Sequence, residues 1–512
     1  FNTMTLIKKE DFIESITEAL QFISYYHSED FIFSMREAYE KEKSIPAKDA
    51  MLQILTSSKM SATGRRPICQ DTGIVVAFIE VGMDVQWQTD LSVEEMVNEG
   101  VKRAYTNQDN PLRPSMVSDP AGKRQNTKDN TPAITHVKII KGDKVHISIS
   151  AKGGGSENKA EFTTLNPSDS IVDWVLKVIP EMGAGWCPPG VIGIGIGGTS
   201  EKAMLMAKES LMLPIDIHEL VDRGPKNKIE ELRIELYNKI NQLGIGAQGF
   251  GGLTTVLDVK IIDYPCHTAS LPVALIPNCA ATRHTHFILD GSGPAHFKIP
   301  DLNIWPQEVW TPKKEAKKVN LDTINKDSIQ EWKEGDLLLL SGKLLTARDS
   351  AHKKIADLLS AGDKLPTEIN LKNKFIYYVG PVASVRDEVI GPAGPTTANR
   401  MDKFMTMMLK DLGILGTIGK AERGADAVKV IKDNQSVYLS AVGGAAYLVS
   451  KAIKSSRVIA FPELGMEAIY EFEVKDMPVM VSVDASGKSI YSEAPAQWKN
   501  KSIPIEVYPS KN

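Results

Sequence analysis

Three of the four cysteines in this 512-residue chain stand in short stretches rich in proline, glycine and small residues, which indicate loops. Cys69 lies in "RRPICQDTG" directly before Gln70 and Asp71, Cys187 lies in "GWCPPG", and Cys279 lies in "IPNCAATRHTHF". None has a CxxC spacing, which argues against a zinc ribbon or a ferredoxin-type loop. Four cysteines are too few for a disulfide framework, so we expect free thiols in a reducing compartment. On numbers alone, each would be a buried, inert thiol.

Two glycine-rich segments have the composition of an anion-binding turn. They are "KGGGSENK" (152–159) and "GPAGPTTANR" (391–400). Adjacent glycines at the start of a helix leave backbone N–H groups open to an anion. Lys152, Lys159 and Arg400 add positive charge that suits a carboxylate or a phosphate. A glycine loop needed only for its backbone geometry is the alternative interpretation of each segment.

A third cluster, "GIGIGG" (193–198), fits the G-x-G-x-x-G fingerprint of dinucleotide-binding folds. It follows a predicted strand and precedes a predicted helix, and Asp216 lies about where the ribose-binding acid is expected. Gly193, Gly195, Gly198 and Asp216 therefore support an NAD-dependent oxidoreductase as one hypothesis. Because no long run of alternating strands and helices surrounds the motif, a tight strand-to-helix turn is the alternative.

The hydrophobic pattern predicts the elements that would hold these segments in place. A polar loop is expected over 107–130, and two strand-like runs joined by the turn "KGD" indicate a β-hairpin (133–140 and 144–151). The expected helices are 10–27, 31–44, 93–106, 200–212 and 228–242, and the expected strands include 74–85 and 191–198.

The chain is expected to fold as two unlike α/β domains that share no obvious repeat. Between Gly291 and Trp332 the composition turns to glycine, proline, lysine and aspartate, so we interpret residues 291–332 as a linker. Residues 1–290 would then form an N-terminal α/β domain, and residues 333–512 a second domain.

Composition and charge exclude several classes of function. A formal net charge of −4 gives no general affinity for nucleic acid or for an anionic membrane. No apolar run approaches the roughly 18 residues that span a bilayer, and no signal-peptide pattern is found, so a cytoplasmic protein is expected. The sequence lacks GxxxxGK[ST], HExxH and GxSxG, which argues against a kinase or a hydrolase.

The cysteine segments, taken with "KGGGSENKAEF", "YPCHTASLPVA", "LLTARDSAHK", "GPTTANRMD" and "GTIGK", resemble class I fumarate hydratases, the iron–sulfur fumarases. The resemblance runs in order from about residue 60 to about residue 490, and the related L-tartrate dehydratases share the framework. It implies a homodimeric hydro-lyase that interconverts (S)-malate and fumarate, with an N-terminal cluster-binding domain and a C-terminal swivelling β/α domain. L-tartrate dehydratase or another diacid hydro-lyase is the nearest alternative.

The resemblance implies a [4Fe–4S] cluster held by Cys69, Cys187 and Cys279. Three thiolates would bind three irons and leave the fourth open, as a catalytic zinc site leaves one position for water or substrate. The open iron would act as a Lewis acid on a hydroxyl and a carboxylate of malate. Cys266 is then left over, and we interpret it as a packed thiol beside His267.

The resemblance also assigns the acids and bases. Thr396 of "GPTTANR" resembles the base that takes the C3 proton, with Asp71 nearby to activate it, because an alcohol is a poor base without such help. Thr397 is the neighbouring hydroxyl and the alternative. His267 resembles the residue that handles the opposite proton, with a structural histidine as the alternative.

A four-carbon dicarboxylate carries two negative charges, for which guanidinium groups are well suited. The residues that resemble the family's substrate-binding positions come from both halves, so the active site is expected between the domains, where closure would exclude water. These residues are Gln70, Arg113, Gly154, Gly155, Arg348, Arg400 and Lys420. One departure is Ala421, which stands where many members have glycine after the lysine.

Overall fold

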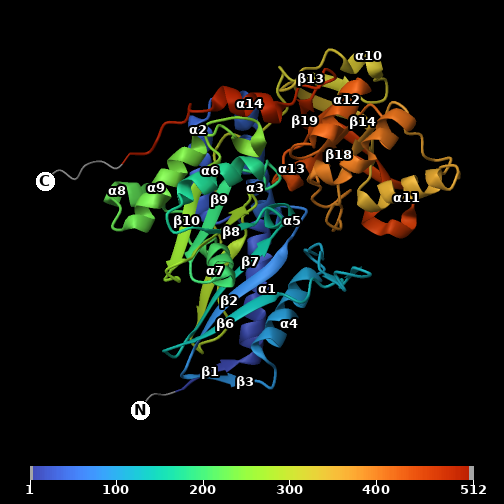
Figure 1. The fold of residues 1–512 in the computed structure, drawn as a ribbon. Helices are drawn as coiled ribbons and strands as arrows, with labels where there is room; N and C mark the ends of the chain where they lie inside the picture. Colours follow the sequence, from blue (N-terminus) through green and yellow to red (C-terminus); the bar gives the residue numbers. More distant parts are fainter. Residues whose placement is uncertain (1–3, 507–512) are drawn as a thin grey trace.

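The computed structural model describes residues 4–506. Two N-terminal four-stranded sheets and one C-terminal seven-stranded sheet are covered and joined by helices (Figure 1). The predicted fold class, α/β with two unlike halves, is confirmed. In the described part of the chain, no helix combines the length and apolar character needed to span a lipid bilayer.

The first N-terminal sheet has the strand order β12-β7-β2-β6. Alternate residues of β2, such as Val75, Ala77 and Ile79, point to one face and pack against α1 and α4 in a single apolar cluster. The bounds are α1 (Lys9–Tyr25), α4 (Val93–Tyr105), β2 (Ile74–Gly82), β6 (Ile134–Ile140), β7 (Val145–Lys152) and β12 (His284–Leu289).

The predicted hairpin of 133–140 with 144–151 is wrong in its pairing. β6 and β7 both form, but β2 lies between them, parallel to β6 and antiparallel to β7. β2 is apolar along most of its length, and a central position gives it a hydrogen-bonded neighbour on both sides. A β6–β7 hairpin would have left this strand at an edge.

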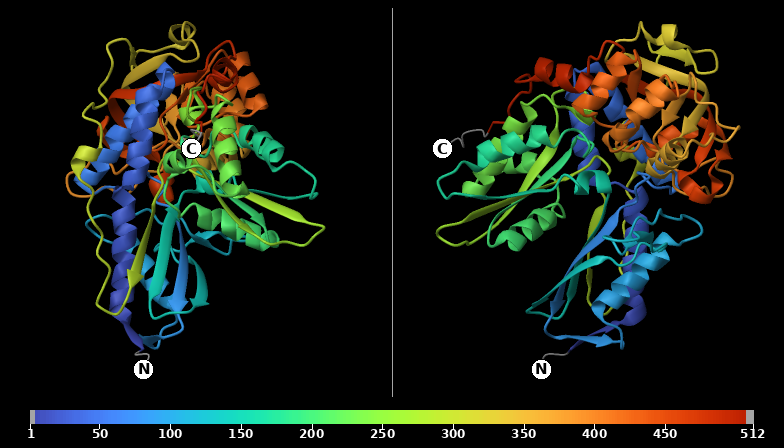
Figure 2. Two further views of the ribbon diagram at one scale, coloured as in Figure 1. Left: turned by 90° about the vertical axis from the view of Figure 1, so that its left-hand side faces the viewer. Right: turned by 45° about the vertical axis from the view of Figure 1, so that its right-hand side comes forward.

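The second N-terminal sheet has the order β10-β9-β11-β8, and its strand β9 is buried at every position. α7 covers one face of this sheet, and α6 and α9 cover the other. Figure 2 shows the two N-terminal sheets diverging as they extend away from the C-terminal half. The bounds are α6 (Ile171–Glu181), α7 (Ser200–Ser210), α9 (Lys228–Asn241), β8 (Glu161–Leu165), β9 (Gly190–Gly197), β10 (Val256–Tyr264) and β11 (Leu271–Asn278).

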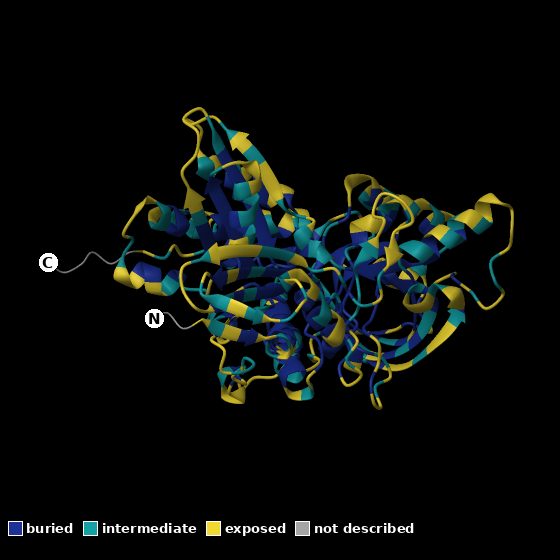
Figure 3. Ribbon diagram, turned by 90° about the horizontal axis from the view of Figure 1, so that it is seen from below, coloured by how far each residue is buried: buried dark blue, intermediate teal, exposed yellow. Residues whose placement is uncertain are grey.

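The C-terminal sheet has the order β13-β14-β15-β16-β17-β19-β18. Because β14 also pairs with β19, the strands from β14 through β17 and β19 close into a ring around an apolar interior. In Figure 3 the buried residues, dark blue, continue from the N-terminal sheets into this half. The bounds are α11 (Asp349–Ser360), α12 (Ala425–Asp433), β13 (Lys317–Asn320), β14 (Leu337–Thr346), β15 (Phe375–Tyr377), β16 (Gly416–Gly419), β17 (Val437–Ser440), β18 (Ile453–Ala460) and β19 (Ile469–Val483).

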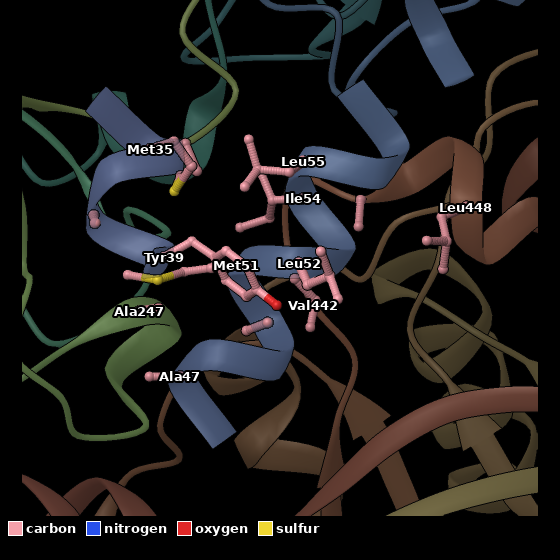
Figure 4. Packing of buried hydrophobic residues seen from close by; sticks show 14 of the residues in the cluster. Met35, Tyr39, Ala47, Met51, Leu52, Ile54, Leu55, Ala247, Val442 and Leu448 are labelled. Atoms are coloured by element: carbon pink, nitrogen blue, oxygen red, sulfur yellow. The ribbon is translucent and has the colours of Figure 1, made fainter. Parts of the chain in front are cut away.

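Helix α3 (Ile45–Gly64) joins the two halves. It begins at Ser44, whose hydroxyl caps the first turn, and most of its residues are buried around the whole circumference rather than along one stripe. Figure 4 shows its Met51 and Leu52 in one apolar cluster with Tyr39 of α2 (Glu29–Lys41) and Val442 of the C-terminal half. A helix buried on all sides has to lie between partners, and here the partners are the two halves.

The stretch predicted as a linker is part of the packed structure. Residues 291–332 contain β13, which pairs with β14, and Trp305, which is buried against α3. The end of the predicted C-terminal domain returns to the other half, because the Asn500 N–H donates to the Gln242 carbonyl oxygen at 2.7 Å. The remaining elements include α2 (Glu29–Lys41), α5 (Gly154–Glu157), α8 (Ile217–Arg223), α10 (Lys326–Ile329), α13 (Ala446–Lys451), α14 (Ile490–Trp498), β1 (Thr5–Lys8), β3 (Val85–Gln88), β4 (Val117–Ser118) and β5 (Gln125–Asn126).

Candidate active site where the two halves meet

Cys69, Cys187 and Cys279 line one cavity at the junction of the two halves. Cys69 and Cys187 are buried, Cys279 is half-buried, and all three are free thiols. Among residues 4–506, no three His, Cys, Asp or Glu side chains are arranged to hold a single metal ion. The other lining residues are Gln70, Asp71, Gly153, Gly155, Ser156, Gly185, Ala281, Arg283, Lys420, Gly443 and Gly444.

Sheet register explains why Cys187 and Cys279 meet. The antiparallel pairing of β9 with β11 sets Val191 opposite Asn278, so the loop before β9 and the loop after β11 leave the same end of the sheet. The Ala280 N–H donates to the Cys187 carbonyl oxygen at 3.0 Å and ties the two loops together.

Cys69 reaches the cavity from α3. Arg65, just after the helix, takes a left-handed conformation with φ 50° and turns the chain. The Ile68 N–H then donates to the Ser24 carbonyl oxygen at 2.9 Å, and the Ile68 side chain is buried. The position of Cys69 therefore depends on how α3 packs between the halves.

Two cations face the thiols. Lys420 Nζ donates to Cys187 Sγ at 3.3 Å. Burial lowers the pKa of Lys420, but the charges of Cys187, Cys69 and Cys279 outweigh it and raise that pKa above its ordinary value. Burial raises the pKa of the Cys69 thiol to about 11, and Arg283 acts in the opposite direction. Both cations favour the thiolate forms that bind metals.

Asp71 is fixed beside the thiols. Its Oδ2 accepts a hydrogen bond from the Gly154 N–H at 2.8 Å, and its Oδ1 accepts one from the Gly73 N–H at 3.1 Å. Burial raises the pKa of Asp71, but Arg113 and Arg283 outweigh burial and hold the pKa below its ordinary value. The carboxylate is therefore ionised near neutral pH.

Two arginines from opposite halves converge on Gly380. Arg113 Nη1 donates to the Gly380 carbonyl oxygen, and a Cβ added at Gly380 would lie 2.0 Å from Arg348 Nη1, so both guanidinium groups lie against this residue. Burial and then repulsion from Arg113 lower the pKa of Arg348 to about 10. Arg348 Nε is buried without a hydrogen-bond partner among the described residues. An anion between these guanidinium groups would relieve both effects.

Gln70 and Thr396 lie where the halves touch. Gln70 Nε2 donates to the Pro395 carbonyl oxygen at 3.4 Å, and the Lys420 N–H donates to the Thr396 carbonyl oxygen at 3.1 Å. Thr397 Oγ1 stands 3.8 Å from where a Cβ on Gly155 would be. Both threonines are thus next to cavity-lining residues, although neither lines the cavity itself.

Ala421 has an unusual backbone conformation, and Arg400 lies outside the cavity. Ala421 has φ 66°, a left-handed conformation that costs a non-glycine residue about 1–2 kcal/mol. The Tyr438 hydroxyl donates to its carbonyl oxygen at 2.7 Å, and Lys420 still reaches Cys187. Arg400 is exposed and forms an ion pair with Asp349, outside the cavity.

The structure does not bring His267 to the cavity of its own chain. His267 and Cys266 lie in the exposed loop between β10 and β11. This loop is at the end of the sheet opposite the cysteines, and the eight residues of β9 span roughly 25 Å at about 3.3 Å each. The interpretation of Cys266 as a packed thiol is wrong, because its side chain is exposed.

The dinucleotide interpretation of "GIGIGG" is also wrong. Cβ atoms at Gly193 and Gly195 would lie 2.5 and 2.0 Å from carbonyl oxygens of α7, so these glycines allow the helix to pack closely on β9. Asp216 Oδ1 accepts hydrogen bonds from Arg233 at 2.6 Å and from Lys260 at 2.5 Å. The carboxylate expected to bind ribose is therefore engaged in a partly buried ion network.

Sequence reasoning missed Arg283, which lines the cavity, and Gln248, which contacts the lining residue Gly443. Gln248 Oε1 accepts the Gly443 N–H at 2.8 Å, and its Nε2 donates to the carbonyl oxygens of Gly443 and Pro188 at 3.1 and 3.2 Å. Gly443 is held so close that a Cβ would lie 2.5 Å from Cys187 Sγ. The only sequence signals were the glycines around Gln248 in "GIGAQGFGG" and the position of Arg283 shortly after Cys279.

The site has the features of an α/β enzyme: thiols, an ionised carboxylate and cations from both halves around one cavity. Two family models match the chain, one described as fumarate hydratase (fumerase) over residues 13–288 and one as the fumarase C-terminus over residues 291–494. The chain belongs to the class I fumarate hydratase family, whose members are hydro-lyases.

Full-length relatives agree with this assignment. The chain is 31% identical to "Fumarate hydratase class I, anaerobic" of Escherichia coli, over 96% of this chain and 92% of that protein. It is also 31% identical to "Fumarate hydratase 2" of Leishmania major, over 93% of this chain and 85% of the relative. A protein of Methanocaldococcus jannaschii named as an L(+)-tartrate dehydratase alpha subunit is 37% identical over 52% of this chain and 94% of its own length.

Proposed function

We propose that this chain reversibly interconverts (S)-malate and fumarate plus water, using a [4Fe–4S] cluster bound by Cys69, Cys187 and Cys279. The observation that carries the proposal is the convergence of three thiols from distant segments on one cavity where the two halves meet. Family membership supports the reaction class and an iron–sulfur cofactor.

The chemistry of the cavity lining fits an anionic iron–sulfur cluster, because its three thiols are the ligands that such clusters take. Lys420 and Arg283 supply positive charge, and Arg283 Nη2 is buried without a partner in the described chain, which calls for an acceptor in the cavity. When bound, such a cluster would supply an iron without a cysteine ligand, a Lewis acid for the substrate's hydroxyl and carboxylate.

The protein's own residues would bind the dicarboxylate and move its protons. Arg113 and Arg348 would each take carboxylate oxygens, because their guanidinium groups converge from opposite halves and Arg348 Nε is buried without a hydrogen-bond partner among residues 4–506. Thr396 would take the C3 proton, and ionised Asp71 would activate it. We propose that Gln70, Gly154, Gly155, Arg400 and Lys420 complete the substrate site.

We further propose that the protein works as a homodimer in the cytoplasm, where its four free thiols stay reduced. If His267 handles the second proton, it has to come from another copy, because it lies at the far end of the sheet in its own chain. Mixing two inactive variants, Cys279→Ser and His267→Ala, would then restore about one quarter of wild-type activity in a dimer with shared sites. No recovery would remove His267 from a shared site.

Oxygen-free turnover of malate, L-tartrate and mesaconate, measured side by side, tests the substrate. We expect the highest kcat/KM for malate and fumarate, without added nicotinamide. L-tartrate dehydratase is the second candidate, because of the archaeal relative at 37% identity. A higher kcat/KM for L-tartrate would replace the first proposal by the second.

A further inference from the structure

Arg283 has a buried hydrogen-bond donor that nothing in the described chain satisfies. Its side chain is only 2% exposed. Nε donates to the Ala281 carbonyl oxygen at 3.0 Å, and Nη1 donates to the Asp71 carbonyl oxygen at 2.5 Å. Nη2 has no hydrogen-bond partner among residues 4–506, and it stands 3.6 Å from where a Cβ on Gly153 would be, at the cavity wall. Leaving a charged donor unsatisfied in a protein interior is costly, so an acceptor inside the cavity is required.

The charge of this arginine is directed at the thiols. Burial lowers the pKa of Arg283, but Cys69, Cys279 and then Asp71 outweigh burial and raise that pKa above its ordinary value. Lys420 serves Cys187 on another side of the cavity. Lys420 and Arg283 therefore place positive charge on two sides of the three thiols.

Arg283 also connects the cofactor ligands to the proposed catalytic carboxylate. Nη1 fixes the backbone of Asp71, and the Ala151 N–H donates to the Arg283 carbonyl oxygen at 3.1 Å, which anchors the arginine near the end of β7. A planar guanidinium holds three such directions at once, which a lysine ammonium on a flexible stem does not.

We propose that Arg283 is a positioning residue for the cluster: Nη2 donates a hydrogen bond to a sulfur of the bound cluster, while Nη1 holds the Asp71 loop against it. This inference rests on the cluster in the proposed function. A hydrogen bond and a positive charge beside a cluster stabilise its reduced form, so Arg283 raises the midpoint potential and slows iron loss.

The test compares wild type, Arg283→Gln and Arg283→Lys after oxygen-free reconstitution. The readouts are iron and sulfide per chain, the rate of iron transfer to a chelator, and the midpoint potential from a redox titration followed by electron paramagnetic resonance. Arg283→Gln should have a lower midpoint potential and lose iron about tenfold faster or more. Arg283→Lys should keep a potential near that of wild type, because the charge stays, but lose iron faster, because the fork is gone.

Arg233→Gln is the matched control. Arg233 is a buried arginine whose partners are Asp216, Asp258 and the Val259 carbonyl oxygen. Its loss should lower the unfolding temperature without changing the midpoint potential of the cluster.

The outcomes separate the two proposals. If Arg283→Gln has the wild-type potential and iron-release rate, the role of Arg283 is overturned while the cluster stands. If Arg283→Gln does not fold, Arg283→Lys decides, and a wild-type rate of iron release in that variant overturns the proposal. If wild type binds neither iron nor sulfide, the proposed function itself fails.

Discussion

The two ends of the sheet that contains β9, β10 and β11 both carry cysteines, but those at one end line a cavity and the one at the other is exposed to solvent. At one end Cys187 and Cys279 face a cavity beneath the C-terminal half, and at the other Cys266 and His267 are exposed. The local sequences are alike, since "GWCPPG", "IPNCAA" and "YPCHT" all place proline beside or near the cysteine. The two ends of the sheet differ in what covers them. The C-terminal half contributes residues to the cavity at one end, so it determines the chemical environment of Cys187 and Cys279.

Replacing one cysteine at each end should give the largest contrast. Cys279→Ser should remove a cluster ligand and lower the iron content and turnover by more than about 100-fold. Cys266→Ser should leave both within about twofold, because the thiol is exposed and remote from the cavity of its own chain. Iron analysis and malate turnover under nitrogen measure the contrast. Equal losses in the two variants would contradict the distinction between the ends.

Thr396 and Thr397, which the C-terminal half places next to the cavity, should give the next largest effect on turnover. Thr396→Ala should lower kcat by about 10²- to 10⁴-fold, the contribution of a positioned proton-transfer group, with the iron content unchanged. Thr397→Ala is its matched control and should lower kcat less. Steady-state kinetics with an iron assay on the same samples decide this, and the reverse order would make Thr397 the base.

Removing the hydrogen bonds that Gln248 makes to Gly443 across the two halves should have a smaller effect. Gln248→Leu leaves the Gly443 N–H and carbonyl unsatisfied next to Cys187, at a cost of about 1–3 kcal/mol for each buried group. The apparent unfolding temperature should fall by several degrees, and iron should be released faster. Gln330→Leu is the control, because its amide also bonds two carbonyls but is exposed, so water replaces it. A similar fall in unfolding temperature in both variants would show that the hydrogen bonds of Gln248 to Gly443 have no special role.

A pH-dependent effect on stability is expected from Lys152, which is buried. Burial lowers its pKa to about 7, with Ser156 Oγ 2.8 Å from Nζ. Because the unfolded chain binds more protons between this pKa and the ordinary value, this lysine makes folding more favourable as pH rises from about 7 towards 10. The free energy of unfolding of apoprotein, measured across this range, should rise more steeply for wild type than for Lys152→Met. If the free energy of unfolding rose equally with pH in wild type and Lys152→Met, the lowered pKa of Lys152 would be ruled out.

The sequence predicted which helices and strands form better than it predicted which of them pair or pack together. β6 and β7 form close to the expected ranges, but the hairpin between them does not, because β2 is more apolar and takes the central place. Likewise, "GIGIGG" fitted a ligand-binding pattern, while its glycines serve the packing of α7 on β9. In both cases the competing information lay in a partner that is distant in the sequence.

The candidate site divides in the same way. The loop character around Cys69, Cys187 and Cys279 and the family could be recognised from the residues, because short motifs determine local backbone and metal-binding chemistry. Arg283 and Gln248 could not, since a lone arginine or glutamine is usually a surface residue and only burial reveals its partners.

By itself, then, the sequence determined the α/β class, the cysteine loops and the reaction family, all of which depend on residue type and short-range order. The tertiary structure decided which thiols face the shared cavity, which end of the sheet is covered, and which donor is left for a cofactor. Those properties depend on low dielectric and on groups held within a few ångströms, and both arise only when distant segments pack together.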